Sequence, residues 1–407
     1  MIRLGVIGYG RRIHGVINNS LRSIDPELRV TAVVDPEKEG VRQRMDPRDR
    51  DVRFYRNIST LLRQRNIDAL AIGTRCNLHT RYAMAVAQSD LPLFLKKPVA
   101  INLRQTTTLK KAYAKSRCPA VVSFLLRVSP LCVLVRVYME DGAVRKPVNI
   151  AATNYVHYGT GYWEAPYRDF AITGGLFLQK ATHDLDYLVY LMGELILLVA
   201  AMATRGRVFG GQKKERYCSQ HDEQHTCLES PQNRKRNDTS GSHVDNLCVF
   251  SKKCGNASDG TINEDCSSAL LEFASGAHGV HTQVFYARRD AGRRGSIVSG
   301  YDRTVNFDWF HGDLRRIRHH APFSATESAN GTASHFGGDL ELARDFIDLI
   351  QGRIRTSRTP IATGIQSAYA CLAARESAQK TATFPSAKWT FKEPIYTWKK
   401  PLNSRKP

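Results

Sequence analysis

The sequence predicts a two-domain protein, in which an α/β domain built on a parallel sheet precedes an α+β domain with a large, mainly antiparallel sheet. In residues 1–122, short apolar runs alternate with segments of helical spacing, which is typical of βαβ units. From residue 123 onward, long alternating runs separated by turns indicate antiparallel strands. The length of 407 residues exceeds the size at which one hydrophobic core stops growing, which agrees with two domains.

The first domain repeats strand, helix and strand. A helix is expected over "IHGVINNSLRSI", where apolar residues recur at helical spacing. The expected buried strands are "IRLGVIG", "RVTAVVD", "IDALAIGT" and "LPLFLKKP".

The second domain is predicted to span residues 123–390, followed by a tail at 391–407. Residues about 210–264, rich in Gly, Ser, Asn and charge, predict one long irregular excursion. Two helices are expected over "GLFLQKATHDLDYLVYLMG" and "DLELARDFIDLIQG", and Asp339 is the expected N-cap of the second.

Composition narrows the class of protein. Hydrophobic residues make up 42% and charged residues 24%, as in ordinary globular chains. The net charge of +21 is compatible with binding to nucleic acid, to an anionic membrane or to an anionic substrate. The basic residues are scattered, however, without a nucleic-acid-binding signature. The longest apolar run, "LILLVAAMA", is about half the ~20 residues that a membrane span needs. We expect a cytoplasmic protein with no nucleic-acid or membrane partner.

The nine cysteines are odd in number and scattered, which favours reduced thiols over a disulfide framework. Cys218, Cys227, Cys248 and Cys254 lie among histidines, so a zinc site is an alternative. Structural zinc ligands usually come in pairs two to four residues apart, and these spacings differ. We therefore expect no metal.

A glycine turn follows the first strand. Gly8 and Gly10 stand between a strand and a helical segment, where glycine lets backbone N–H groups approach a pyrophosphate. Ile13 takes the place of the third glycine of the motif. Asp35 ends the second strand 22 residues after Ile13, close to the spacing of a carboxylate that binds the adenosine ribose. Together these residues predict a Rossmann dinucleotide site.

The same turn bears on the choice of cofactor. Asp35 favours NAD, because a carboxylate there repels the 2′-phosphate of NADP. Arg11 and Arg12 soften that preference, so NADP stays possible.

The segment "KATHDLD" places Lys180, His183 and Asp184 at helical spacing, on one face or nearly so. Transfer of a hydride from an alcohol carbon needs a base for the hydroxyl proton, and histidine suits that role near neutral pH. A neighbouring lysine orients the hydroxyl or stabilises a developing oxyanion. These three residues are the candidate catalytic group.

Several of these motifs resemble the Gfo/Idh/MocA oxidoreductases, and the resemblance extends to about residue 390. In "GTRCNLHT", Thr74 and His79 match the family's loop after the fourth strand. In "FLKKPVA", Lys97 and Pro98 match its Glu-Lys-Pro motif, with Lys96 in place of the glutamate. The resemblance implies that Lys97 lies near the nicotinamide and the substrate.

The resemblance also covers the helix with "KATHDLD". The family often has an aspartate four residues before the histidine, where this chain has Gln179, and a subset carries a lysine in that turn. The usual aspartate–histidine pair cannot form here, so the identity of the general base stays open.

Further residues are candidates for substrate contact, with core packing as the alternative for the aromatic segment before the catalytic helix. Aromatic and cationic side chains before the catalytic helix are of the kind that faces sugar rings. The candidates are Arg127, Tyr155, Tyr162, Trp163, Arg168 and His335.

The resemblance implies an NAD(P)-dependent dehydrogenase that acts on a hydroxyl of a sugar, polyol or sugar derivative, and a homo-oligomer. The positive charge adds an anionic substrate as an option. One alternative is an NAD-dependent glycosidase that works by transient oxidation and elimination. Another is a dinucleotide-binding protein without turnover, suggested by Lys96.

Overall fold

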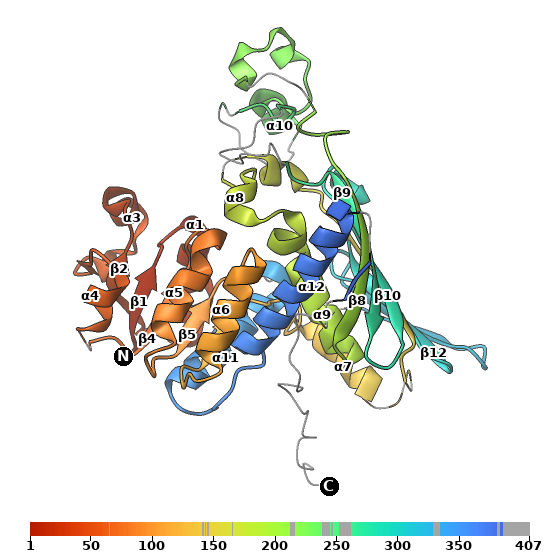
Figure 1. The fold of residues 1–407 in the computed structure, drawn as a ribbon, viewed down its shortest axis with the longest axis horizontal. Helices are drawn as coiled ribbons and strands as arrows, with labels where there is room; N and C mark the ends of the chain where they lie inside the picture. Colours follow the sequence, from red (N-terminus) through yellow and green to blue (C-terminus); the bar gives the residue numbers. More distant parts are fainter. Residues whose placement is uncertain are drawn as a thin grey trace.

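The computed structural model places two sheets with helices around them (Figure 1). It describes residues 1–64, 66–140, 142, 144, 146–164, 166–211, 216–237, 245, 247–251, 262–328, 334–380 and 383–385.

The first sheet has six parallel strands in the order β3-β2-β1-β4-β5-β6. This is the strand order of a Rossmann domain, in which ligands bind at the carboxyl ends of the strands where the order reverses. The predicted α/β domain is therefore confirmed. The strands are β1 (Arg3–Ile7), β2 (Arg29–Val34), β3 (Arg53–Phe54), β4 (Ala69–Ile72), β5 (Leu93–Leu95) and β6 (Ala120–Val122).

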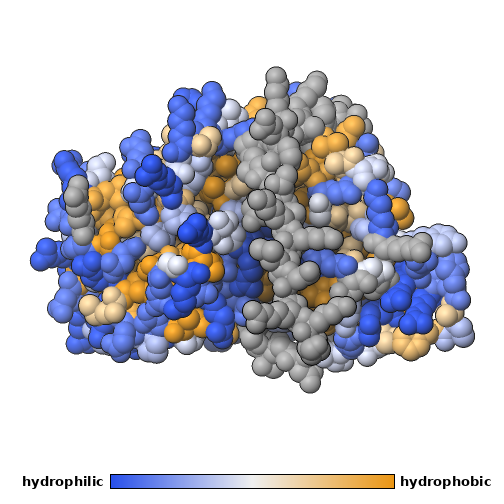
Figure 2. All heavy atoms as spheres, turned by 90° about the horizontal axis from the view of Figure 1, so that it is seen from below, coloured by the Kyte–Doolittle hydropathy of each residue, from blue (hydrophilic) through white to orange (hydrophobic). Residues whose placement is uncertain are grey.

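The helices of this domain follow its strands. The expected first helix extends over residues 11–24, with a π-helical turn in its middle. The α-helices are α1 (Arg11–Val16), α2 (Arg22–Ile24), α3 (Lys38–Arg44), α4 (Ile58–Leu62), α5 (His79–Val86) and α6 (Leu103–Tyr113), and the short turns are η1 (Ile17–Leu21), η2 (Pro47–Asp49) and η3 (Cys76–Leu78). In the view from below, hydrophilic side chains cover much of this domain, in line with the scattered charge (Figure 2).

The second sheet has nine strands in the order β14-β13-β12-β11-β7-β10-β9-β8-β15. All its pairs are antiparallel except β7 with β10, so the predicted sheet type is confirmed. The apolar run "LILLVAAMA" lies largely in β8, and no helix of the described residues is long and apolar enough to cross a membrane. The strands are β7 (Asn149–Tyr155), β8 (Ile196–Thr204), β9 (Cys266–Phe273), β10 (His278–Val284), β11 (Arg293–Ser299), β12 (Arg303–Asp308), β13 (Asp313–Arg318), β14 (Ser324–Ser328) and β15 (Thr383–Pro385).

Helices α9 and α12 pack on one face of this sheet, and α12 also packs on α6, so it joins the two domains (Figure 1). The helices are α7 (Pro130–Glu140), α8 (Phe170–Thr173), α9 (Thr182–Met192), α10 (Pro231–Arg236), α11 (Gly338–Ile350) and α12 (Ile361–Lys380). The short turns are η4 (Gly159–Trp163), η5 (Phe177–Ala181), η6 (Cys218–Gln220), η7 (Asp222–His225), η8 (Arg289–Ala291) and η9 (Ser334–Gly337).

The described parts of the excursion, which include α10, rise above the rest of the molecule (Figure 1). Its two ends meet at the fully buried Asp265, whose carboxylate accepts hydrogen bonds from the backbone N–H groups of residues 207, 208 and 209. The neighbouring Glu264 accepts from the N–H of Leu176, at the start of the candidate catalytic helix, and Asn263 donates to the carbonyl of Tyr162. The base of the excursion is thus fastened to the segments that carry the candidate site.

The cysteines of the excursion are the ligands of the alternative zinc site. Cys254 lies outside the described residues. Within the described ranges, no group of three or more His, Cys, Asp and Glu residues is arranged to hold a metal ion.

Candidate functional site

The glycine turn lies at the carboxyl ends of β1 and β2. Gly8 has a φ of +78°, and a Cβ there would lie 2.6 Å from Cγ2 of Thr74, so only glycine fits against the loop after β4. Gly10 precedes α1 in extended conformation, and a Cβ there would have a nearest neighbour 3.9 Å away, the Gly73 carbonyl. The room beside Gly10 is therefore open to a ligand. Asp35 accepts a hydrogen bond of 2.8 Å from the N–H of Tyr9, which holds the carboxylate beside the turn.

The three residues after Gly10 have different surroundings. Arg11 is exposed, whereas the Arg12 guanidinium lies 2.6 and 2.7 Å from the two carboxylate oxygens of Asp339. The expectation that Asp339 caps α11 is wrong: the N-cap is Gly337, in the left-handed region, and the Asp339 side chain points to Arg12 instead. Ile13 is buried, and a Cβ on Gly73 would lie 2.6 Å from the Cβ of Ile13. The Ile13 side chain therefore packs α1 against the loop after β4.

His79 joins two loops at the carboxyl ends of β4 and β5. Its ring nitrogens lie 2.7 Å from the Pro98 carbonyl and 3.0 Å from the Thr74 carbonyl. Burial lowers the pKa of His79 to about 4, so the imidazole is neutral and donates its single N–H to one of these carbonyls. His79 thereby positions Thr74 and the Lys97–Pro98 segment, rather than presenting a free nitrogen.

Lys97 connects the two domains at the candidate site. Its ammonium donates a hydrogen bond to the carbonyl of Gln179, in the π-helical turn that precedes α9. Burial, and then the positive charge of Lys180, lower the pKa of Lys97 to about 7. The amine therefore changes protonation near neutral pH.

Lys180 lies in the same π-helical turn and is buried. Its Nζ donates to the hydroxyl of Tyr158 at 2.5 Å and lies 4.6 Å from the centroid of the Tyr158 ring and 5.7 Å from that of Tyr162. Burial, and then Arg294, hold the pKa of Lys180 well below its ordinary value.

His183 is also buried, and its Nδ1 has no hydrogen-bond partner among the described residues. Its ring packs edge-on against Phe124, with the ring centroids 6.0 Å apart. Burial, and then Lys97, hold the pKa of His183 well below its ordinary range, so the imidazole is neutral at physiological pH.

Asp184 differs from its neighbours because it faces the second sheet. Its carboxylate accepts from Arg294 at 2.7 and 2.9 Å and from the Asn154 amide at 2.7 Å, and lies 3.4 Å from Nε2 of His281. Burial alone would raise its pKa, but the Arg294 charge outweighs burial and keeps the pKa below its usual value. These contacts anchor α9 to the second sheet, and a catalytic role of Asp184 beside His183 stays a prediction.

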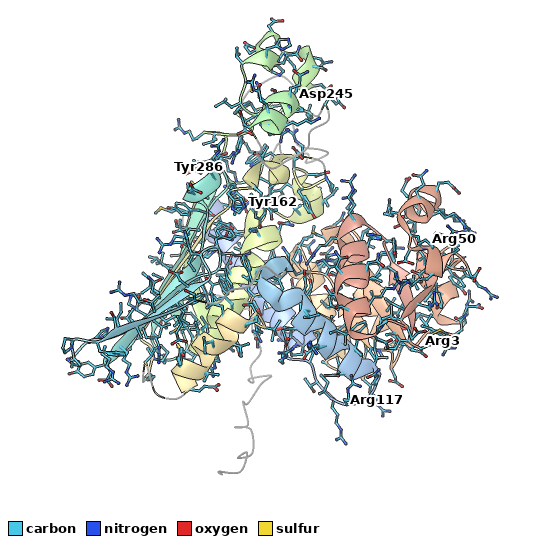
Figure 3. The ribbon with its side chains drawn as sticks, turned by 180° about the vertical axis from the view of Figure 1, so that it is seen from behind. Arg3, Arg50, Arg117, Tyr162, Asp245 and Tyr286 are labelled. Atoms are coloured by element: carbon cyan, nitrogen blue, oxygen red, sulfur yellow. The ribbon has the colours of Figure 1, made fainter. Side chains whose placement is uncertain are left out.

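Of the substrate-contact candidates, Tyr162 lies beside Lys180, packed between Tyr158 and Phe285. Figure 3 shows Tyr162 at the base of the excursion, below Asp245. The side chain of His335 lies outside what the structure describes.

The other four candidates have partners of their own within the described residues, and their contact with the substrate stays a prediction. Trp163 is buried in an apolar cluster with Phe209, Val249 and Ile262. Arg168 donates to the carbonyls of residues 247, 248 and 251, which holds the excursion in place.

Arg127 forms a buried ion pair of 2.8 Å with Asp186. Tyr155 ends β7, is 37% exposed and pairs in the sheet with Val284 and Arg293.

The sequence reasoning missed Tyr158, although it lies in the aromatic segment that was noted, directly after His157. It also missed the partners of Asp184, since Asn154, His281 and Arg294 come from three strands that no local pattern brings together.

Comparisons with known proteins agree with this geometry. A model described as "Oxidoreductase family, NAD-binding Rossmann fold" matches residues 2–124, and one described as "Oxidoreductase family, C-terminal alpha/beta domain" matches residues 141–383.

Among curated relatives, a myo-inositol 2-dehydrogenase of Thermotoga maritima is 25% identical over 193 residues, 47% of this chain and 55% of the relative. A scyllo-inositol 2-dehydrogenase (NAD(+)) of Bacillus subtilis is 24% identical over 218 residues, 53% of this chain and 60% of the relative. The matches thus span somewhat more than half the length of these relatives.

Among solved structures, a levoglucosan dehydrogenase in complex with NADH superimposes with a TM-score of 0.71 at 17% identity, and covers 95% of this chain and 99% of its own. This similarity shows the same fold over nearly the whole chain. With family models matched to both domains, the chain belongs to the Gfo/Idh/MocA family of oxidoreductases.

Proposed function

We propose that this protein is an NAD-dependent oxidoreductase that transfers a hydride between the cofactor and a hydroxyl of a sugar, polyol or sugar derivative. The observation that carries the proposal is the hydrogen bond from Lys97 to the Gln179 carbonyl. It joins the Rossmann domain to the turn that carries Lys180, three residues before His183. The inositol dehydrogenases and levoglucosan dehydrogenase among the similar proteins support this substrate class.

The residues at the carboxyl ends of the strands fit a dinucleotide. Gly10 leaves room for a pyrophosphate, and the amides that begin α1 have no side-chain cap. We expect Asp35, whose carboxylate accepts from the Tyr9 N–H beside the turn, to bind the ribose hydroxyls, which supports NAD over NADP. Arg12 is engaged by Asp339, so it does not offset that preference. NAD, when bound, accepts the hydride.

The residues of the second domain then supply the proton chemistry. Lys97 and Lys180 orient the hydroxyl oxygen and stabilise the negative charge that develops on it. The hydroxyl proton passes to a neutral nitrogen of this group, for which His183 is the candidate from the sequence.

The test is to incubate the purified protein with NAD, and separately with NADP, against free sugars, inositols and chromogenic glycosides. Net reduction of NAD by a free sugar or inositol is expected. Aglycone release without accumulating NADH would instead establish the glycosidase alternative. Binding of NADH without either reaction would support the non-catalytic alternative.

The buried charges favour an anionic member of this substrate class. The Asp184 carboxylate is engaged by Arg294, and no ion pair within the described residues includes the Lys97 ammonium, which donates to the Gln179 carbonyl. A substrate carboxylate would compensate the Lys97 charge. Sugar acids are therefore expected to give a higher kcat/KM than their neutral counterparts, and an equal or lower value would refute this preference.

We also propose that the exposed face of the second sheet forms a homo-oligomer. Leu270 pairs with Val280, Val280 with Ala151 and Ala151 with Ile297, an apolar row across four strands. Leu270 is 61% and Ile297 40% exposed. Contact of these apolar side chains with water is unfavourable, and a second copy of the chain would cover them. Leu270→Lys is expected to shift the mass measured by light scattering to that of one chain, and an unchanged mass would refute the interface.

The end of β6 at Val122 supports the proposed domain boundary at residues 122 and 123, whereas the tail at 391–407 lies outside the described residues.

The described cysteines form no disulfide bonds, which supports the cytoplasm as the compartment. Fractionation of cells that express the protein tests this.

A further inference from the structure

Lys180 is a buried amine without a carboxylate of its own. The nearby Asp184 is held by Arg294 and Asn154, and no ion pair within the described residues includes Lys180. Its hydrogen-bond partner there is the hydroxyl of Tyr158, at 2.5 Å. The Tyr158 and Tyr162 rings lie against the same nitrogen.

The exposure of the two side chains differs. Lys180 is 3% exposed, whereas Tyr158 is half-buried. A phenolic hydroxyl both donates and accepts hydrogen bonds, so it can carry a proton to a nitrogen that does not itself meet solvent. Of the two hydrogen-bonded side chains, Tyr158 is therefore the one that meets solvent.

His183 is a less suitable proton acceptor. Its Nδ1 is buried without a partner, so no described carboxylate stabilises the cation that protonation would create. Lys97, Arg294 and Lys180 all oppose a further positive charge on this ring.

We propose that Tyr158 and Lys180 act as one proton-transfer pair for the substrate hydroxyl, with His183 left to orient that hydroxyl. The inference rests on the proposed function and deepens it. In the oxidation direction, the C–H bond of the alcohol carbon breaks and its electron pair leaves with the hydride to the cofactor. The O–H bond breaks as well, and its proton moves to the Tyr158 oxygen while the Tyr158 proton moves to the neutral Lys180 nitrogen. The C–O bond becomes a carbonyl, and the Lys180 ammonium later returns the proton to solvent by the same path.

The test compares Tyr158→Phe and Lys180→Met with the wild type, with myo-inositol and NAD as the first probes. Each variant is expected to lower kcat by about 10²–10⁴-fold, which is the usual contribution of a general acid or base. The Kd for NADH is expected to change less than about twofold. Because the two residues act as a unit, the double variant is expected to be no slower than the slower single variant.

The pH profile separates a proton role from a structural one. Activity through a neutral Lys180 falls as the pH decreases, and this limb is expected to flatten in both variants. Charged and titratable groups face the pair from several elements, and any limb that remains in the variants belongs to them. These groups are His157, Tyr162, Lys97, His183, Asp184 and Arg294.

Two further variants serve as controls for the loss of a tyrosine hydroxyl and for the loss of the Lys180 charge. Tyr167→Phe changes a tyrosine of the same segment that is 39% exposed, and is expected to keep kcat within about threefold. Lys180→Arg keeps the charge, but a guanidinium does not give up its proton, so it is expected to lose as much activity as Lys180→Met. If Tyr158→Phe does not fold, Lys180→Arg still decides the question.

The outcomes distinguish the two proposals. If the wild type reduces NAD with no sugar or polyol, the inference falls together with the proposed function. If the wild type turns over but Tyr158→Phe or Lys180→Arg keeps its kcat and pH profile, only this inference is overturned, and His183 is the acceptor.

Discussion

The substitution Asp184→Asn tests whether this residue is an anchor or a catalytic group. The Asp184 carboxylate is fully buried and accepts two hydrogen bonds from Arg294, at 2.7 and 2.9 Å. Asparagine keeps the shape but removes the charge. The Arg294 guanidinium, itself only 4% exposed, is then left in the interior without a counter-charge.

The magnitude follows from this geometry. Breaking a buried ion pair by removing one partner costs about 3–5 kcal/mol. For a domain of about 150–250 residues, each kcal/mol lowers Tm by roughly 2–4 °C, so the expected loss is roughly 6–20 °C. Replacing both partners, as in Asp184→Leu with Arg294→Met, is expected to recover part of that loss, because no charge is then left unpaired.

Thermal unfolding and urea titration measure the effect, with the exposed Asp290→Asn as the matched control. Because the folded-state pKa of Asp184 lies below its unfolded value, its contribution is fully present above about pH 4 and is lost only as the pH falls through the lower, folded value. The difference between wild type and variant should therefore be constant from pH 6 to 8. An unchanged Tm together with a large loss of kcat would refute the anchor and restore the catalytic role expected from the sequence.

Three other substitutions test the cofactor turn and the domain junction. Gly8→Ala places a methyl group 2.6 Å from the Thr74 side chain at a φ of +78°, so the Kd for NADH in a fluorescence titration is expected to rise at least about tenfold, and an unchanged Kd would contradict the packing. Arg12→Ala removes the ion pair between Arg12 and the buried Asp339, and a Tm lower by several degrees is expected in a thermal scan, whereas an unchanged Tm would show that the pair adds nothing to stability. The pKa of Lys97 is about 7 in the folded protein against an ordinary 10.5, so between these values the unfolded chain binds more protons and Lys97 makes stability rise with pH. Urea unfolding at pH 7, 8 and 9 should show this rise in the wild type and a smaller one in Lys97→Met, and equal slopes would contradict the shift.

The parts of the fold that local patterns determine were predicted well. Short apolar runs before turns identified four of the six parallel strands, β1, β2, β4 and β5. The helix over "KATHDLD" was located correctly because its apolar spacing and its closing Gly193 are both local signals. The glycine turn and Asp35 were likewise found from spacing alone, and the structure brings them together through the Tyr9 N–H.

What failed depended on distant partners. The pair of Arg12 and Asp339 joins residues 327 positions apart, so Asp339 was taken for a cap. Lys180 lies in a π-helical turn, which holds about one residue more per turn than an α-helix. Counting residues at α-helical spacing therefore did not show that Asp184 faces the sheet. For Trp163, the choice between core and site depended on an apolar cluster that the excursion completes, and no pattern near Trp163 contains that information.

The closure of the excursion at Asp265 has an evolutionary consequence. Since the carboxylate fixes both ends of the segment to one point, insertions, deletions and substitutions between them need not displace the strands on either side. Asn263 and Glu264 nevertheless link that point to the Tyr162 segment and to the start of the helix with His183. Variation in this one stretch of chain can therefore alter substrate choice while the redox chemistry is inherited unchanged.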